Sequence, residues 1–102
     1  YKKAIFNDGT IRSYVIVKLQ ITEDAKRSSA TGRKCRCSEA KVLEIKSIDE
    51  ETVFESAVSQ WDSRFVYKTG ETVRVDDFNE NRFVECTSGI HFFITRQEAV
   101  DY

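Results

Sequence analysis

One stretch of alternating side chains constrains the fold more than any other part of the chain. Its four apolar members are separated by single residues and are Val15, Val17, Leu19 and Ile21. Because successive side chains of a β-strand point to opposite faces, this period of two predicts a strand with one fully apolar face. We expect this strand to lie at the centre of a sheet.

A hairpin turn precedes this strand. Asn7, Asp8, Gly9 and Thr10 follow the apolar residues 4–6. The Asp-Gly pair supplies the positive-φ residues of a type I′ or related turn. The sequence therefore predicts a strand, a turn and a second strand that ends near residue 21.

Further short strands are expected along the rest of the chain. They are residues 41–46, with a bulge or a short helix near residues 38–41, then 52–58, 65–67, 72–75 and 90–94. Residues 26–34 lack apolar periodicity and are expected to form a loop. Trp61 is expected to cap the core, and Phe78 to anchor the polar loop around it.

The C-terminal stretch combines a turn, a strand and the start of a helix. Ser88 and Gly89 supply the turn, and Thr95 and Glu98 have the spacing of a capping box. Ala99 and Tyr102 lie one helical turn apart and are expected to pack onto the sheet. The sum is an α+β domain, mostly antiparallel β, with six or seven short strands and a C-terminal helix.

Length and composition fit one domain that spans residues 1–102. The chain is 40% hydrophobic and 32% charged, and no Pro/Gly/Ser-rich run divides it. It begins with Tyr1 and not with Met, so we expect a domain excised from a longer protein. An odd number of cysteines, three, favours a reducing, cytoplasmic setting. We expect no membrane partner, because no apolar run approaches the ~18–20 residues that cross a bilayer.

Positive charge is concentrated in one segment of a chain whose net charge is −1. From Lys26 to Lys46 there are seven basic residues and two acidic ones, whereas residues 76–85 are acidic. The near-zero net charge gives no strong case for nucleic acid. The candidate ligand-binding residues are Lys26, Arg27, Ser28, Ser29, Arg33, Lys34, Arg36 and His91.

The chemistry of this basic loop suits a phosphate or an acidic peptide. It combines guanidinium groups, hydroxyls and a flexible glycine. It is not a P-loop, because the Gly-x₄-Gly-Lys-Ser/Thr order is absent. The alternative is a solvated loop whose charges meet the acidic segment, residues 76–85.

The cysteines and the single histidine form a second candidate site. Cys35, Cys37, Cys86 and His91 would complete a tetrahedral zinc set. Cys-x-Cys on a strand places two sulfurs on one face about 7 Å apart, but the spacing of Cys86 and His91 is loose for paired ligands. Two alternatives remain: cysteines that fill the core, and a catalytic pair of Cys86 and His91. We expect no obligatory metal or cofactor.

Three sequence pieces carry a family resemblance. They are Ala25-Lys26-Arg27 with Gly32–Arg36 and Ala40–Leu43, then Phe65–Tyr67 with Gly70, Glu71, Val73, Asp77 and Phe78, and Glu85-Cys86 with Gly89–Phe93, Glu98 and Ala99. The chain resembles a domain of unknown function seen in phage, giant-virus, bacterial and protist proteins, often beside pentapeptide repeats. Cys37 departs from the single cysteine expected there. The resemblance implies no established activity.

A second, looser likeness involves the same C-terminal stretch. Residues 89–93, followed by Ala99 and Tyr102, are similar to the Gly-Ile-Tyr-Phe-Ala strand and following helix of ADP-ribosyltransferases. The chain is short for that fold, and no separate histidine completes a nicotinamide site.

We therefore predict a non-enzymatic binding or interaction module. Residues 26–36 would bind a phosphate-bearing small molecule, nucleotide-like, or an acidic protein partner. The alternatives are an ADP-ribosyltransferase-like or other transferase domain that uses the Cys86 and His91 region, and a zinc-stabilised structural scaffold.

Overall fold

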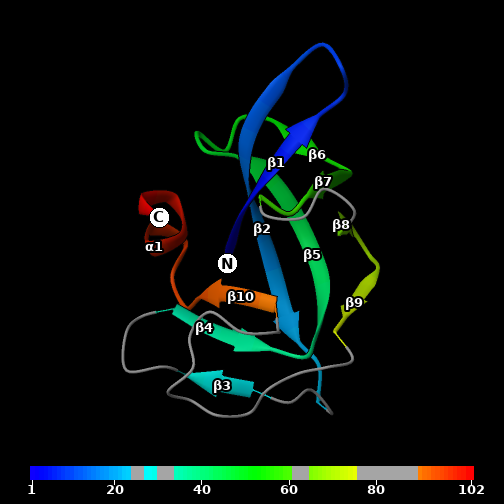
Figure 1. Ribbon diagram of the computed structural model, residues 1–102. Helices are drawn as coiled ribbons and strands as arrows, with labels where there is room; N and C mark the ends of the chain where they lie inside the picture. Colours follow the sequence, from blue (N-terminus) through cyan, green and yellow to red (C-terminus); the bar gives the residue numbers. More distant parts are fainter. Residues whose placement is uncertain (24–26, 30–33, 61–64, 76–89) are drawn as a thin grey trace.

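The computed structural model confirms an α+β architecture of antiparallel strands with a short C-terminal helix (Figure 1). It describes residues 1–23, 27–29, 34–60, 65–75 and 90–102, with the backbone alone for residues 27–29, 34 and 35. The expectations for Trp61, Phe78 and the Ser88-Gly89 turn lie outside these residues. Among the described helices, none is long and apolar enough to cross a membrane.

A seven-stranded antiparallel sheet forms most of the domain. Its spatial order is β6-β5-β2-β1-β7-β8, and β9 also pairs with β5. The strands are β1 (Lys2–Asn7), β2 (Arg12–Ile21), β5 (Glu39–Ser47), β6 (Val53–Phe54), β7 (Ser56–Val58), β8 (Val66–Lys68) and β9 (Thr72–Arg74). The strand predicted over 52–58 is thus two strands, interrupted at Glu55.

The hairpin between β1 and β2 forms where Asp-Gly predicts a turn. Gly9 has a φ of 89°. The Asp8 carboxylate accepts hydrogen bonds from Thr10 N (2.9 Å) and Ile11 N (2.7 Å). These bonds, the one from Ile11 above all, lower the pKa of Asp8. The connection covers residues 8–11, so it is one of the longer hairpin loops and not a two-residue type I′ turn.

The second strand is central, as its alternation predicts, because β2 lies between β1 and β5. Val15 and Val17 are fully buried in the core. Ile16 points to the other face and is also buried. The helix α1 (Arg96–Asp101) packs against β1 and β2, which explains why both faces of β2 are covered at this point (Figure 1).

Strand β5 contains a bulge, but it lies further along the strand than the sequence predicts. A bend at Ser38 separates β5 from the preceding strand, as expected, but the register against β2 shifts further along. Lys18 pairs with Glu44 and Leu19 pairs with Val42, so Leu43 is the extra residue. The bulge buries Val42 and leaves Leu43 partly exposed. Ile45, two residues further on, is fully buried, so Leu43 and Ile45 do not share a buried face.

The larger sheet curls until its ends are joined by the turn between β8 and β9. Gly70 N donates to Val42 O (2.8 Å), and Val42 N donates to Glu71 O (2.9 Å). On the other side, Thr69 N donates to Glu55 O (2.9 Å). Gly70 permits this turn because its φ is 88°.

A hydrophobic core fills the curled sheet. Tyr67 enters it from β8 and is 2% exposed. Burial, and to a smaller degree the neighbouring Cys37, raises the pKa of the Tyr67 phenol. The core cluster also includes Val73, Ile90 and Phe92. It therefore extends from the larger sheet into a smaller one.

The smaller sheet has three strands, in the order β10-β4-β3. They are β3 (Arg27–Ser29), β4 (Lys34–Cys37) and β10 (Ile90–Phe93), at the end of the molecule opposite the β1–β2 turn (Figure 1). The prediction of a loop over residues 27–29 is wrong. Pairing with β4 supplies the hydrogen bonds of β3, and local sequence carries no sign of it.

The C-terminal helix begins as the capping box predicts. The Thr95 hydroxyl accepts a hydrogen bond from Glu98 N (3.3 Å), and the Glu98 carboxylate accepts one from Thr95 N (3.1 Å). Ala99 is fully buried, and the Tyr102 ring lies 5.2 Å from that of Phe93. Both predicted contacts of the helix with the sheets are thus present, although Tyr102 is about half exposed.

Candidate functional site

The described parts of the basic segment, residues 27–29 and 34–36, belong to two strands beside the strand that carries His91. β4 pairs with β3 along one edge and with β10 along the other. Ser28 lies opposite Arg36, and Arg36 lies opposite His91. These three register positions form one row across the small sheet, so the pairing brings part of the basic segment to the histidine.

Arg36 and His91 form the kind of antiparallel pair whose side chains approach most closely. Phe93 N donates to Tyr1 O (2.7 Å), Tyr1 N donates to Phe93 O (2.6 Å), and Lys2 Nζ donates to His91 O (2.9 Å). Alternate residues of a strand bond toward opposite edges, so His91 and Phe93 bond away from β4. Arg36 and His91 are therefore a non-hydrogen-bonded pair, with Cβ atoms roughly 4.5–5.5 Å apart.

The two members of this pair differ in burial. Arg36 is 3% exposed, whereas His91 is half-buried. A buried guanidinium is costly unless its donors and its charge are matched, and Arg36 has an interaction partner within the chain. Arg36 therefore lies inside the domain, and His91 is the member of the pair that solvent reaches.

The structure places the other predicted ligand-binding residues in two groups. The first lies on the small sheet and is known by backbone position: Arg27, Ser28 and Ser29 on β3, and Lys34 on β4. The second, Lys26 and Arg33, lies outside the described residues. The Lys34 position is on the same strand face as Arg36, whereas the Arg27 position lies opposite Cys37, on the other face.

The predicted zinc set is not assembled by the β4–β10 pair. Cys37 lies opposite Ile90, and His91 is the next residue, so Cys37 and His91 are on opposite faces of the sheet. Cys37 is a fully buried thiol in the core. Cys35 pairs with Phe92 through its backbone, and Cys86 lies outside the described residues. In the described part of the chain, no group of three or more potential ligands could hold a metal ion.

The predicted Cys86 and His91 pair keeps only its histidine within the described residues. The backbone of His91 is held by Lys2, as given above. The catalytic pair of Cys86 and His91 therefore stays a prediction.

Three cations that the sequence did not single out hold the C-terminal segment in place. Lys2 reaches the carbonyl of His91, Lys3 Nζ donates to Val100 O (3.1 Å), and Arg96 reaches the turn after β5. Each contact joins residues 49 to 97 positions apart. No local pattern could have indicated them, because the partners are backbone carbonyls distant in sequence.

A separate polar cluster lies at the start of β5. Arg74 donates to Glu39 Oε1 through Nε (3.0 Å) and Nη2 (2.7 Å), and the Thr22 hydroxyl donates to Glu39 Oε2. The bond from Thr22, and then those from Arg74, lower the pKa of Glu39. This cluster joins β2, β5 and β9 and is architectural.

Two hollows in the described surface lie away from His91. One, of about 440 Å³, lies at the β8–β9 turn and is lined by Glu55, Ser56, Lys68, Thr69 and Glu71. A small one, of about 30 Å³, is lined by Ile5, Arg12, Ser13 and Tyr14. Neither collects the buried or convergent groups of a preformed small-molecule site.

Comparison with known proteins gives a family relationship. A family model described as a family of unknown function (DUF5758) matches residues 1–99. No curated protein and no solved structure matches the chain. The match extends over every described strand and into α1, and the family brings no activity with it.

Proposed function

The chain belongs to the DUF5758 family, a family of unknown function, and from that premise we propose that it is a non-enzymatic binding module. Its ligand is a phosphate-bearing small molecule, nucleotide-like. The ligand binds at the small sheet, where the basic segment, residues 26–36, lies beside His91.

The observation that carries the proposal is the cross-strand row of Ser28, Arg36 and His91. A hydroxyl, a guanidinium and an imidazole are all hydrogen-bond donors to phosphate oxygens, and cationic donors make the stronger bonds. Arg36 is buried and supplies a fixed positive charge behind His91. The Lys34 position, two residues from Arg36 along β4, adds a basic residue to the same strand face.

An acidic protein segment is the competing ligand for the same donors. Carboxylates accept from guanidinium groups with a geometry close to that of phosphate. The resemblance to domains found in phage, giant-virus, bacterial and protist proteins beside pentapeptide repeats belongs to the same proposal. The domain would serve there as the ligand-binding part of a longer, cytoplasmic protein.

Isothermal titration against a panel of nucleotides tests the proposal. We expect a nucleotide that carries at least two phosphates to bind, and the Arg33→Ala, Lys34→Ala double variant to lose most of that affinity, because the Lys34 position shares a strand face with Arg36. The matched control is Lys18→Ala with Lys41→Ala, which removes the same charge from exposed positions on the larger sheet. The control should bind as the wild type does.

Three results would contradict the proposal. The first is no heat with any nucleotide, and the second is equal loss in both double variants, which would indicate a general charge effect. The third is consumption of NAD that His91→Ala abolishes, which would favour the transferase alternative. Binding of a polyglutamate peptide, without binding of any nucleotide, would identify an acidic protein segment as the ligand of this site.

A further inference from the structure

The C-terminal helix is too short to be stable by itself. α1 spans six residues, and isolated helices below about 12–15 residues are marginal in water. Its capping box satisfies the first turn, but the helix position relative to the sheets needs other contacts. Those contacts are made at both ends of the helix.

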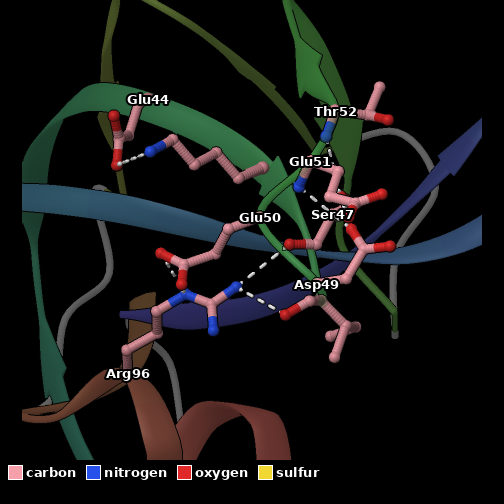
Figure 2. Close-up of polar contacts among 9 residues, drawn as sticks. Glu44, Ser47, Asp49, Glu50, Glu51, Thr52 and Arg96 are labelled. Atoms are coloured by element: carbon pink, nitrogen blue, oxygen red, sulfur yellow. Dashed lines mark hydrogen bonds and ion pairs between the residues drawn. The ribbon is translucent and has the colours of Figure 1, made fainter.

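At the start of α1, Arg96 holds the turn that follows β5 (Figure 2). Arg96 Nη2 donates to Ser47 O and to Ile48 O, each at 3.0 Å, and Nε lies 3.6 Å from the Glu50 carboxylate. One side chain thus joins two carbonyls and one carboxylate. Cationic donors make hydrogen bonds about twice as strong as neutral ones.

The turn that receives Arg96 is itself ordered by its own polar contacts. Asp49 accepts hydrogen bonds from the Ser47 hydroxyl and from Glu51 N, and the Ser47 hydroxyl accepts one from Thr52 N (Figure 2). Glu50 has a φ of 63°, a left-handed conformation, and its N donates to Ser47 O (2.9 Å). Arg96 therefore meets a preformed acceptor.

At the other end of α1, Lys3 holds the last turn. Lys3 Nζ donates to Val100 O (3.1 Å) and lies 4.8 Å from the centre of the Tyr14 ring. A cation at the C-terminal end of a helix also complements its dipole. Together with the buried Ala99, these contacts fix α1 on the outer face of β1 and β2.

The helix is directly connected to the strand that carries His91. Ile94 and Thr95 alone separate β10 from α1, and the Tyr102 ring packs on Phe93. β10 itself has four residues and pairs with β4 and, through Phe93, with Tyr1. A displacement of α1 therefore also displaces or loosens β10.

We infer that α1 restrains β10 and thereby sets the position of His91 in the binding site, with Arg96 as its main positioning residue. The ligand in this inference rests on the proposed function, but the restraint of β10 by α1 does not. Release of Arg96 frees α1 from the turn after β5 and loosens β10. The affinity of the small sheet for its ligand then falls without any change to the ligand-contacting residues.

The test measures amide hydrogen exchange in Ile90–Phe93 and ATP affinity in one set of variants. Arg96→Met should raise exchange in β10 about tenfold and weaken ATP binding about fivefold. Arg96→Lys should recover part of both, because an ammonium can still donate to the two carbonyls. Glu50→Gln should give a smaller change in the same direction. Arg12→Met is the control, since that side chain is exposed and has no ion pair within the described residues.

Two outcomes would overturn this role of α1. One is unchanged exchange in β10 of Arg96→Met, and the other is raised exchange with unchanged ATP affinity. If wild-type protein binds no ATP, the proposed function fails and the positioning role falls with it. The exchange data would then still decide whether α1 restrains β10.

Discussion

The two sheets use the same antiparallel pairing but differ in what covers their faces. In the larger sheet, β2 has apolar residues buried on both sides, with Val15 and Val17 in the core and Ile16 on the opposite face, beside Lys3, which binds α1. In the smaller sheet, one face belongs to the core, and the other carries the Arg36 and His91 pair. The difference separates residues that the fold requires from His91, which solvent, and so a ligand, can reach.

Strand β10 shows this division within four residues. Ile90 and Phe92 are core residues, whereas His91 lies between them on the opposite face. Because the same strand is also joined to β1 and to α1, it is a structural connection first and a binding element second. The predictions below address this comparison in order of expected effect.

The largest effect is expected from truncation of the core shared by the two sheets. Ile45→Ala in the larger sheet and Ile90→Ala in the smaller one should each lower the free energy of unfolding by about 2–5 kcal/mol, because each leaves a cavity. Urea denaturation with a single cooperative transition for both variants would show one folding unit. A loss below about 1 kcal/mol for Ile90→Ala alone would mean that the smaller sheet is not part of that core.

A smaller effect is expected at the turn that joins the ends of the curled sheet. Gly70→Ala should cost roughly 1–2 kcal/mol, because a Cβ is unfavourable at a φ of 88°. No neighbouring atom in the described structure lies within 4 Å of the added Cβ, so the cost comes from the backbone alone. Thermal denaturation measures it. An unchanged melting temperature would mean that the turn is not held in this conformation.

Removal of the helix cap is expected to have an effect of about 1 kcal/mol. Thr95→Ala deletes the hydroxyl that accepts from Glu98 N, and Thr95→Ser retains it. Chemical denaturation of both variants separates loss of the cap from loss of the methyl group. Equal stability of the two variants would contradict a role for the hydroxyl.

The smallest effect at neutral pH is expected from Glu39, since its partner Arg74 is largely exposed. The pKa of Glu39 in the folded state is below its ordinary value of 4.5. Its contribution is therefore present above that value and is lost as the pH falls through the folded pKa. Glu39→Gln should flatten the acid limb of a plot of melting temperature against pH. An unaltered acid limb would contradict the pKa assignment.

The elements that sequence predicts correctly are those whose signal is local. The alternation from Val15 to Ile21 identifies β2, Asp8 and Gly9 identify the hairpin, and Thr95 with Glu98 identifies the helix start. Each of these depends on residues within one strand or one turn. Their physical causes, face alternation, positive φ and N-capping, act at that same range.

The features that sequence misses depend on distant partners. β3 has no apolar alternation and exists through pairing with β4, and the bulge at Leu43 is set by the register against β2. The burial of Arg36 and the contacts of Lys2, Lys3 and Arg96 likewise involve residues far apart in the chain. The candidate site was therefore predictable as a set of residue types but not as a row across one sheet.

His91 offers the most direct test, because it is the single histidine and its ring protons are a unique NMR signal. Titration with ATP should shift the His91 imidazole resonances in the wild-type protein and should leave them almost unchanged in the Arg33→Ala, Lys34→Ala double variant. The Lys18→Ala, Lys41→Ala control should behave as the wild type. A wild-type signal that does not move at millimolar ATP would contradict the assignment of this face as the binding surface.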